Sequence, residues 1–177
     1  MRVLGVDPGS AVTGFGVVEG RPGDFRFIAA GVIRTSSIER APNRLKRIHE
    51  QLLAAIDAYR PDAVSLERSF VAANVQSAFR LGEARAMAML AAAERGLPLE
   101  EYPPNQVKLA VAAFGHADKS QVKYMVRRTL GLAADYELPD DAADALAIAI
   151  CHLGRARAPR LVDAVERPAL PARLRRR

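Results

Sequence analysis

The segment from Met1 to Val18 constrains the fold of this chain more than any other part of it. Residues 2–6, apolar apart from Arg2, form a strand pattern that ends on Asp7, and a Pro-Gly turn follows before Thr13–Val18 resumes a strand. Two strands joined by so tight a turn pair as a hairpin, so the carboxylate of Asp7 is held at a rigid strand end. Such a carboxylate can bind a hard cation, or it can serve only the backbone amides of its own turn.

The composition limits the class of protein. At 177 residues, 50% of them apolar, the chain is long enough for one domain with its own hydrophobic core. It has no run of the roughly 20 apolar residues that span a bilayer, and its start does not resemble a signal peptide. We therefore expect a cytoplasmic protein. The single cysteine, Cys151, rules out an internal disulfide and a cysteine-based metal cluster.

The net charge of +6 is confined to the end of the chain. Residues 154–177 hold eight arginines against two acidic residues, so basic and acidic groups balance within residues 1–153. The end segment also contains three prolines and has no helical or strand period. We expect one domain over residues 1–153 and a disordered, arginine-rich tail over 154–177. The tail either attracts phosphate groups nonspecifically or only keeps the chain soluble.

Strand and helix patterns alternate through the rest of the domain. Residues 25–33 continue the first two strands as an antiparallel meander, and an amphipathic helix over 42–59 leads to a strand that ends on Glu67. A helix followed by a strand implies a crossover onto the sheet. The other expected elements are a helix at 74–95, a strand at 97–102, a helix from Asn105, which can cap it, to Phe114, a helix at 119–130, and a last helix from Pro139-Asp140-Asp141 to Leu153.

The helix at 74–95 is dominated by Ala, Met and Leu, so it is apolar around much of its circumference. A helix of this kind is buried either in the core of its own domain or against a second subunit.

Four acidic residues come from three elements that can meet at one edge of the sheet. Asp7 and Glu67 end two strands, while Asp141 and Asp144 are three residues apart and share a face of the last helix. Each also has an ordinary explanation, because acids cap helices and favour the first helical turn. If the four converge, their repulsion requires a cation among them. Ligands with oxygen donors only select Mg²⁺ or Mn²⁺, and a pair of such ions supports phosphoryl transfer.

Short motifs follow one another in order along residues 2–152. They are Leu4-Gly5-Val6-Asp7-Pro8-Gly9-Ser10 with Thr13-Gly14-Phe15-Gly16, then Glu67, Phe70, Ala72-Ala73-Asn74, Leu81-Gly82 and Ala84-Arg85, then Gln106-Val107-Lys108, Lys119-Ser120-Gln121-Val122 and Asp141-Ala142-Ala143-Asp144-Ala145-Leu146. Together they closely resemble the RuvC family of Holliday junction resolvases, which are crossover junction endodeoxyribonucleases.

The resemblance implies an α/β, ribonuclease-H-like fold with a five-stranded mixed sheet, its first three strands antiparallel, flanked by helices. It also implies a homodimer that resolves four-way junction DNA by paired symmetric nicks in recombination and repair. A twofold dimer suits a substrate of near twofold symmetry. The implied partners are the branch-migration proteins RuvA and RuvB. The implied catalytic and metal-binding residues are Asp7, Glu67, Asp141 and Asp144, with two Mg²⁺ ions that Mn²⁺ can replace.

Three further residues match family positions. Lys119 corresponds to a catalytic, DNA-contacting lysine, Lys108 to another basic residue at the DNA surface, and Phe70 to an aromatic that stacks on bases at the junction centre. The two lysines could instead be solvated charges, and Phe70 a core residue. Asp140 precedes Asp141 where the family pattern has one acid; the register with Asp144 favours Asp141, leaving Asp140 as a capping residue or a minor ligand.

Three alternatives differ in what they require. An actin-like or sugar-kinase-like ATPase needs two such domains around its nucleotide, and this chain has room for one. An RNA-processing nuclease of the same superfamily would lack the motifs around Phe70 and Lys119. A catalytically silent DNA-binding protein would tolerate the loss of the four acids.

Overall fold

The computed structural model describes residues 1–9, 11–36, 38–68, 75–113 and 115–155. Phe70 and nearly all of the arginine-rich tail lie outside the described residues. The expectations that Phe70 stacks on bases and that the tail is disordered therefore stay predictions.

A single sheet of five strands forms the centre of the molecule. Strands β1, β2 and β3 pair antiparallel, β4 pairs with β1 in parallel, and β5 pairs with β4 in parallel, which gives the order β3-β2-β1-β4-β5. The expected mixed sheet with an antiparallel first part is confirmed. The strands are β1 Arg2–Asp7, β2 Val12–Arg21, β3 Asp24–Arg34, β4 Ala63–Glu67 and β5 Leu99–Tyr102.

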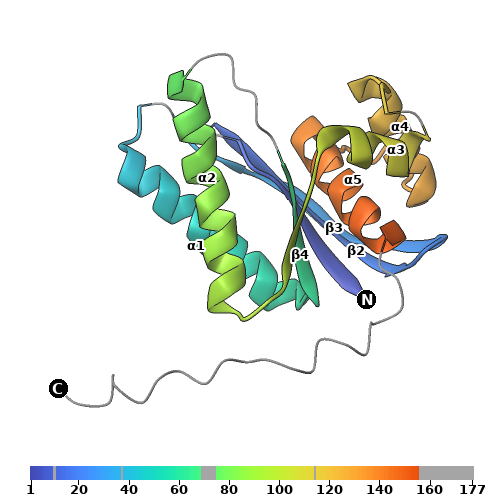
Figure 1. Cartoon of the computed structure of the whole chain (residues 1–177), viewed down its shortest axis with the longest axis horizontal. Helices are drawn as coiled ribbons and strands as arrows, with labels where there is room; N and C mark the ends of the chain where they lie inside the picture. Colours follow the sequence, from blue (N-terminus) through green and yellow to red (C-terminus); the bar gives the residue numbers. More distant parts are fainter. Residues whose placement is uncertain (10, 37, 69–74, 114, 156–177) are drawn as a thin grey trace.

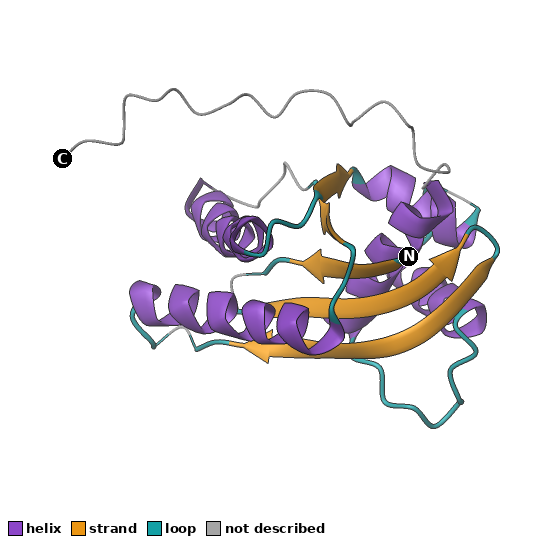
Figure 2. Ribbon diagram, turned by 90° about the horizontal axis from the view of Figure 1, so that it is seen from below, coloured by secondary structure: helices purple, strands orange, loops and turns teal. Residues whose placement is uncertain are grey.

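Helices cover both faces of this sheet (Figures 1 and 2). Helices α1 and α2 lie on one face, and α3, α4 and α5 lie on the other. Within the described residues, no helix is both long and apolar enough to cross a membrane. The helices are α1 Ala41–Tyr59, α2 Val75–Glu94, α3 Pro104–Ala112, α4 Lys119–Thr129 and α5 Asp140–Arg155.

Alternation along β1 decides which helices its residues meet. Leu4 and Val6 are buried with the residues of α1 and α2, whereas Val3 is buried with those of α5. Since successive side chains of a strand point to opposite faces, Asp7 shares the α5 face with Val3. The strand pattern therefore directs the carboxylate of Asp7 toward the last helix.

Helix α5 lies directly on the backbone of the sheet at two glycines. A Cβ atom at Gly5 would lie 2.0 Å from the carbonyl oxygen of Ala145, and one at Gly14 would lie 1.9 Å from that of Asp141. No real side chain fits at such distances, so only glycine allows this approach. The close contact brings the first turns of α5, with Asp141 and Asp144, against the end of β1.

Two helices begin differently from what the sequence pattern predicts. The prediction that Asn105 caps a helix is wrong, because α3 begins at Pro104 with Pro103 as its N-cap and no side-chain cap. Proline fits the first helical turn, where its missing N–H costs nothing. Helix α4 has a cap that the sequence analysis missed: Asp118 and Gln121 form a reciprocal capping box.

Candidate active site

The ends of two neighbouring parallel strands place Asp7 and Glu67 at one edge of the sheet. Val6 pairs in register with Leu66, and the next residue of each strand is the acid. The two carboxylates line one pocket together with Asp144 of α5. Three of the four acids singled out from the sequence are therefore brought together from three elements of the fold.

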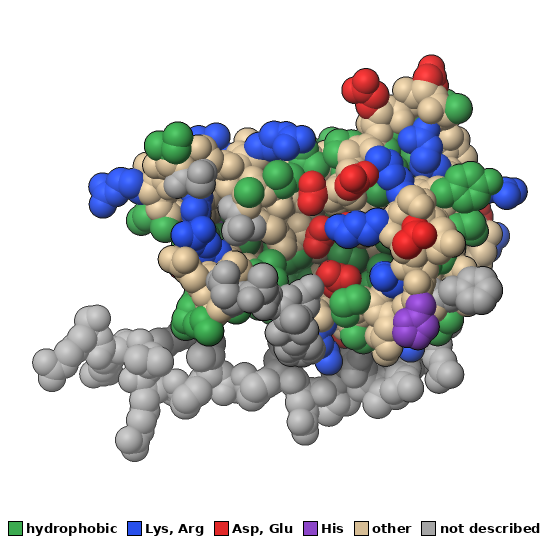
Figure 3. Space-filling view, turned by 90° about the horizontal axis from the view of Figure 1, so that it is seen from above, with side chains coloured by type: hydrophobic (Ala, Val, Ile, Leu, Met, Phe, Trp, Pro, Cys, Tyr) green, Lys and Arg blue, Asp and Glu red, His purple; other side chains and the backbone are tan. Residues whose placement is uncertain are grey.

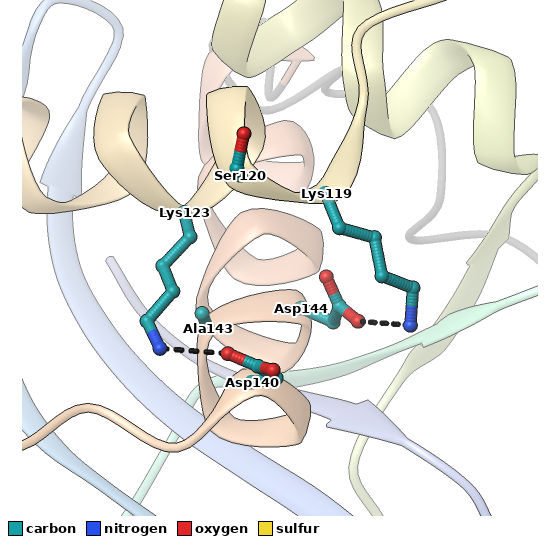
Figure 4. Close-up of a pocket in the computed structure, with 6 residues that line it drawn as sticks. All are labelled: Lys119, Ser120, Lys123, Asp140, Ala143 and Asp144. Carbon is teal, nitrogen blue, oxygen red and sulfur yellow. Dashed lines mark hydrogen bonds and ion pairs between the residues drawn. The ribbon is translucent and has the colours of Figure 1, made fainter.

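Two lysines complete the wall of this pocket. Lys108 comes from α3 and Lys119 from the first turn of α4. Figure 3 shows acidic side chains gathered beside basic ones on this face of the molecule. The Nζ atom of Lys119 lies 3.5 Å from a carboxylate oxygen of Asp144, and Figure 4 shows this lysine reaching from α4 to α5. The site thus combines partly buried acids with cations at its rim.

Asp7 is the most perturbed of the acids. Its pKa is raised to about 7, chiefly by burial and then by the charges of Asp144, Glu67 and Asp141, while the charge of Lys119 opposes the shift. Asp141 does not line the pocket, but its charge acts on Asp7 from one turn earlier on α5. Burial also raises the pKa of Asp144, against the attraction of Lys119. The carboxylates repel one another, and a bound cation would relieve that repulsion.

The donor type at this site fits a hard divalent cation. As the side chains stand, the described residues contain no group of three His, Cys, Asp or Glu that could hold a metal ion. The nearby donors are carboxylate oxygens on the ends of rigid elements, and one of them is paired with Lys119. The acids would have to close in, and Lys119 to release Asp144, for a Mg²⁺ or Mn²⁺ ion to be held.

Asp140 makes a different contact from its neighbour. It is the first residue of α5, and its exposed carboxylate lies 2.6 Å from Nζ of Lys123 (Figure 4). This ion pair lines a second hollow, beside the one that holds Asp7. The structure thus records a surface ion pair for Asp140, for which the sequence left the alternatives of a capping residue and a minor ligand.

The surroundings of Glu67 include a contact that the sequence patterns do not predict. Its backbone carbonyl accepts a hydrogen bond from Arg85 of α2, and the same guanidinium donates to Glu101 of β5. Arg85 stands in the matched motif Ala84-Arg85, but that motif alone gives no indication of which groups the arginine contacts.

A mixed sheet with helices on both faces, and acids at the ends of its first and fourth strands, defines the ribonuclease-H-like class of fold. The model of the family described as "Crossover junction endodeoxyribonuclease RuvC" matches residues 3–152. The chain belongs to the RuvC family.

Individual relatives agree over most of their length. RuvC of Chloroflexus aurantiacus is 49% identical over 152 residues, which cover 86% of this chain and 92% of the relative. RuvC of Saccharophagus degradans is 50% identical over 151 residues, or 85% of this chain and 86% of the relative. Both are named crossover junction endodeoxyribonucleases.

Solved structures confirm the fold. Thermus thermophilus RuvC, solved in complex with a Holliday junction substrate, is 40% identical with a TM-score of 0.81, covering 86% of this chain and 92% of its own. The yeast mitochondrial Holliday junction resolvase is 15% identical with a TM-score of 0.59. The match covers 86% of this chain and 78% of the resolvase, and at this identity it shows the fold alone.

Proposed function

We propose that residues 1–153 form a structure-selective endonuclease that resolves Holliday junctions by metal-dependent hydrolysis of phosphodiester bonds. The observation that carries this proposal is the convergence of Asp7, Glu67 and Asp144 from three elements on one pocket with Lys119. Membership of the RuvC family and the match to a junction-bound RuvC support the choice of substrate over that of an RNA-processing nuclease.

In this proposal the four acids hold the metal, and the lysines serve the DNA. Asp7, Glu67, Asp141 and Asp144 would hold two Mg²⁺ ions, which Mn²⁺ could replace. When bound, such ions activate a water molecule and neutralise the charge that develops on the phosphate. Lys119 releases Asp144 and turns its ammonium to the scissile phosphate, where a fixed cation stabilises the transition state. Lys108 contacts the DNA backbone, and Phe70 stacks on an unpaired base.

The proposal also requires a second copy of the chain, and α2 carries the surface for it. This helix packs into the core only from its middle onward, through Ala84, Ala88, Ala91 and Ala92. In its first half, Val75 and Phe79 are 74% and 70% exposed. They line a shallow apolar groove with Ala78, Gly82, Glu83 and Ala86. A twofold dimer through this groove would present two active sites to two equivalent strands, as paired nicks require.

The implied partners beyond DNA are the branch-migration proteins RuvA and RuvB, by family membership.

Cleavage of synthetic DNA tests the proposed function. The purified protein is incubated with a four-way junction, a linear duplex and an RNA–DNA hybrid, each with Mg²⁺ and with Mn²⁺. We expect paired nicks in the junction alone, and loss of at least about 100-fold in rate for Asp7→Asn with junction binding retained, because a metal-binding carboxylate is removed. Asp57→Asn, a surface acid paired with Arg95 on the α1 side, is the matched control and should cleave normally. Normal cleavage by Asp7→Asn would overturn the assignment of the site.

A further inference from the structure

Arg85 joins helix α2 to the two strand ends beside the candidate active site. Its Nη1 atom donates a hydrogen bond to the backbone carbonyl oxygen of Glu67, at 3.2 Å. Its Nη2 atom donates to a carboxylate oxygen of Glu101 in β5. One guanidinium therefore bridges the last residue of β4 and a side chain of the neighbouring strand.

The strand ends that it bridges are already paired. Leu66 lies opposite Glu101 and Glu67 opposite Tyr102 in the parallel register, and the amide of Arg68 donates to the Tyr102 carbonyl at 2.7 Å. Arg85 adds a side-chain bond across the same two strands at the point where the ladder ends. The orientation of the Glu67 backbone is thereby fixed from two sides.

The contact is shielded from solvent. The side chain of Arg85 is 20% exposed and that of Glu101 21%, and burial lowers the pKa of Arg85. A half-buried guanidinium needs acceptors for its donors, and its planar fork can serve two at once. The neighbouring Ala84 and Ala88 are buried against the core, so the part of α2 that carries Arg85 cannot shift freely.

We propose that Arg85 is a positioning residue, which holds the end of β4 so that the carboxylate of Glu67 points at the same place as that of Asp7. This inference rests on the proposed function, because it assigns Arg85 a part in that site. An ion pair that serves only the stability of the fold would bond Glu101 alone. The bond to the carbonyl of Glu67 is the feature that a purely stabilising contact does not need.

Replacing the guanidinium group of Arg85 tests the proposal. We compare wild type, Arg85→Gln and Arg85→Lys in two measurements: calorimetric binding of Mn²⁺ to the protein without DNA, and the rate of junction cleavage against Mg²⁺ concentration. We expect Arg85→Gln to weaken Mn²⁺ binding and to lower the cleavage rate by about 10-fold to 100-fold, the range for residues that orient metal ligands. Arg85→Lys should recover part of both, because one ammonium cannot bridge both acceptors as the fork does.

A matched control separates position from stability. Arg95, just beyond the end of α2, pairs bidentately with Asp57 of α1 and is remote from the pocket. Arg95→Gln removes another, more exposed arginine–carboxylate pair and should leave Mn²⁺ affinity and cleavage unchanged. Junction binding in EDTA and the oligomeric state should be the same for all variants. Mn²⁺ affinity and cleavage of folded Arg85→Gln within twofold of Arg95→Gln would overturn the proposal, as would a loss that only follows weaker junction binding or dimer dissociation.

Glu101→Ala covers the case in which Arg85→Gln does not fold. It removes the other acceptor of Arg85, together with a longer ion pair of 3.8 Å to Arg68. It should weaken Mn²⁺ binding in the same direction, whereas wild-type affinity in this variant would refute the role of the bridge. Failure of the wild-type protein to cleave any junction would instead overturn the proposed function.

Discussion

At the scale of single residues, the fold and the proposed chemistry make opposite demands on Asp7. The fold places its carboxylate where burial and three other acids disfavour the charge, raising its pKa from 3.8 to about 7. Metal binding requires the charged form. The folded, metal-free protein therefore carries an unfavourable charge at neutral pH.

This leads to a prediction about stability and pH. Because the folded-state pKa is raised, the protonated form of Asp7 favours folding below about pH 4, and this advantage is lost as the pH rises through 7. In EDTA, Asp7→Asn should match wild type at pH 4 and be more stable by about 2 to 4 kcal/mol at pH 8. Urea unfolding at several pH values measures it.

The control for this prediction is Asp57, whose pKa is shifted in the opposite direction from that of Asp7. Arg95 lowers the pKa of Asp57, so Asp57→Asn should gain nothing from rising pH. An Asp7→Asn stability difference that is the same at pH 4 and pH 8 would contradict the prediction.

The acids could be found from the sequence, and their surroundings could not. Asp7 and Glu67 end strands whose apolar patterns are short-range and unambiguous, and the i, i+3 spacing of Asp141 and Asp144 is visible in the chain itself. The bonds of Arg85 join a helix to two strand ends that are distant in sequence. A long side chain reaches such partners only once the elements are packed, so no local sequence pattern predicts these hydrogen bonds.

At the scale of secondary structure, the close contact of α5 with Gly5 and Gly14 of the sheet gives a second prediction. Gly5→Ala would place Cβ 2.0 Å from the backbone of Ala145, so the helix must move away. We expect a loss of about 2 to 3 kcal/mol in the free energy of unfolding, together with loss of cleavage.

Gly154→Ala is the matched change on α5 itself, since nothing lies within 4 Å of its added Cβ. It should stabilise the helix by up to about 1 kcal/mol. Equal stability of the two variants in urea unfolding would refute the close contact.

The cap of α4 gives a third prediction. Asp118 accepts a hydrogen bond from the amide of Gln121 at 2.9 Å, and the next residue is Lys119. Asp118→Ala should destabilise the protein by about 1 kcal/mol and loosen the turn that carries Lys119, so cleavage should fall as well. Asp118→Ser, which keeps a capping oxygen, should restore both. Thermal unfolding and cleavage rates measure the pair, and identical behaviour of Ala and Ser would contradict the cap.

The sequence pattern located every described strand and helix but was less reliable at their ends. The strand expected at residues 13–18 runs over Val12–Arg21, because the turn at Pro22-Gly23 ends it rather than a change in polarity. The start of α3 differs from the prediction because both Pro103-Pro104 and Asn105 are residues at which a helix can begin. The choice between them depends on the direction in which the chain leaves β5, and the local sequence does not specify that direction.

At the scale of the whole molecule, the exposed half of α2 predicts the oligomeric state. Phe79→Glu would place two charges in the twofold interface proposed here, since each copy contributes its own. We expect the dimer to dissociate and paired nicking to be lost, as measured by analytical ultracentrifugation and junction cleavage. Leu109→Glu, at an exposed apolar residue of α3, should stay dimeric. A dimeric Phe79→Glu protein would place the interface elsewhere.

The close contact of α5 with Gly5 and Gly14 also bears on how such a chain can evolve. Where side chains separate a helix from a sheet, each substitution in the core shifts the helix and anything it carries. Here main-chain atoms touch at Gly5 and Gly14, so the spacing between the acids of α5 and those of the strands is set without side chains. Neutral drift can therefore rewrite much of the core without changing the size of the active site, provided these two glycines persist.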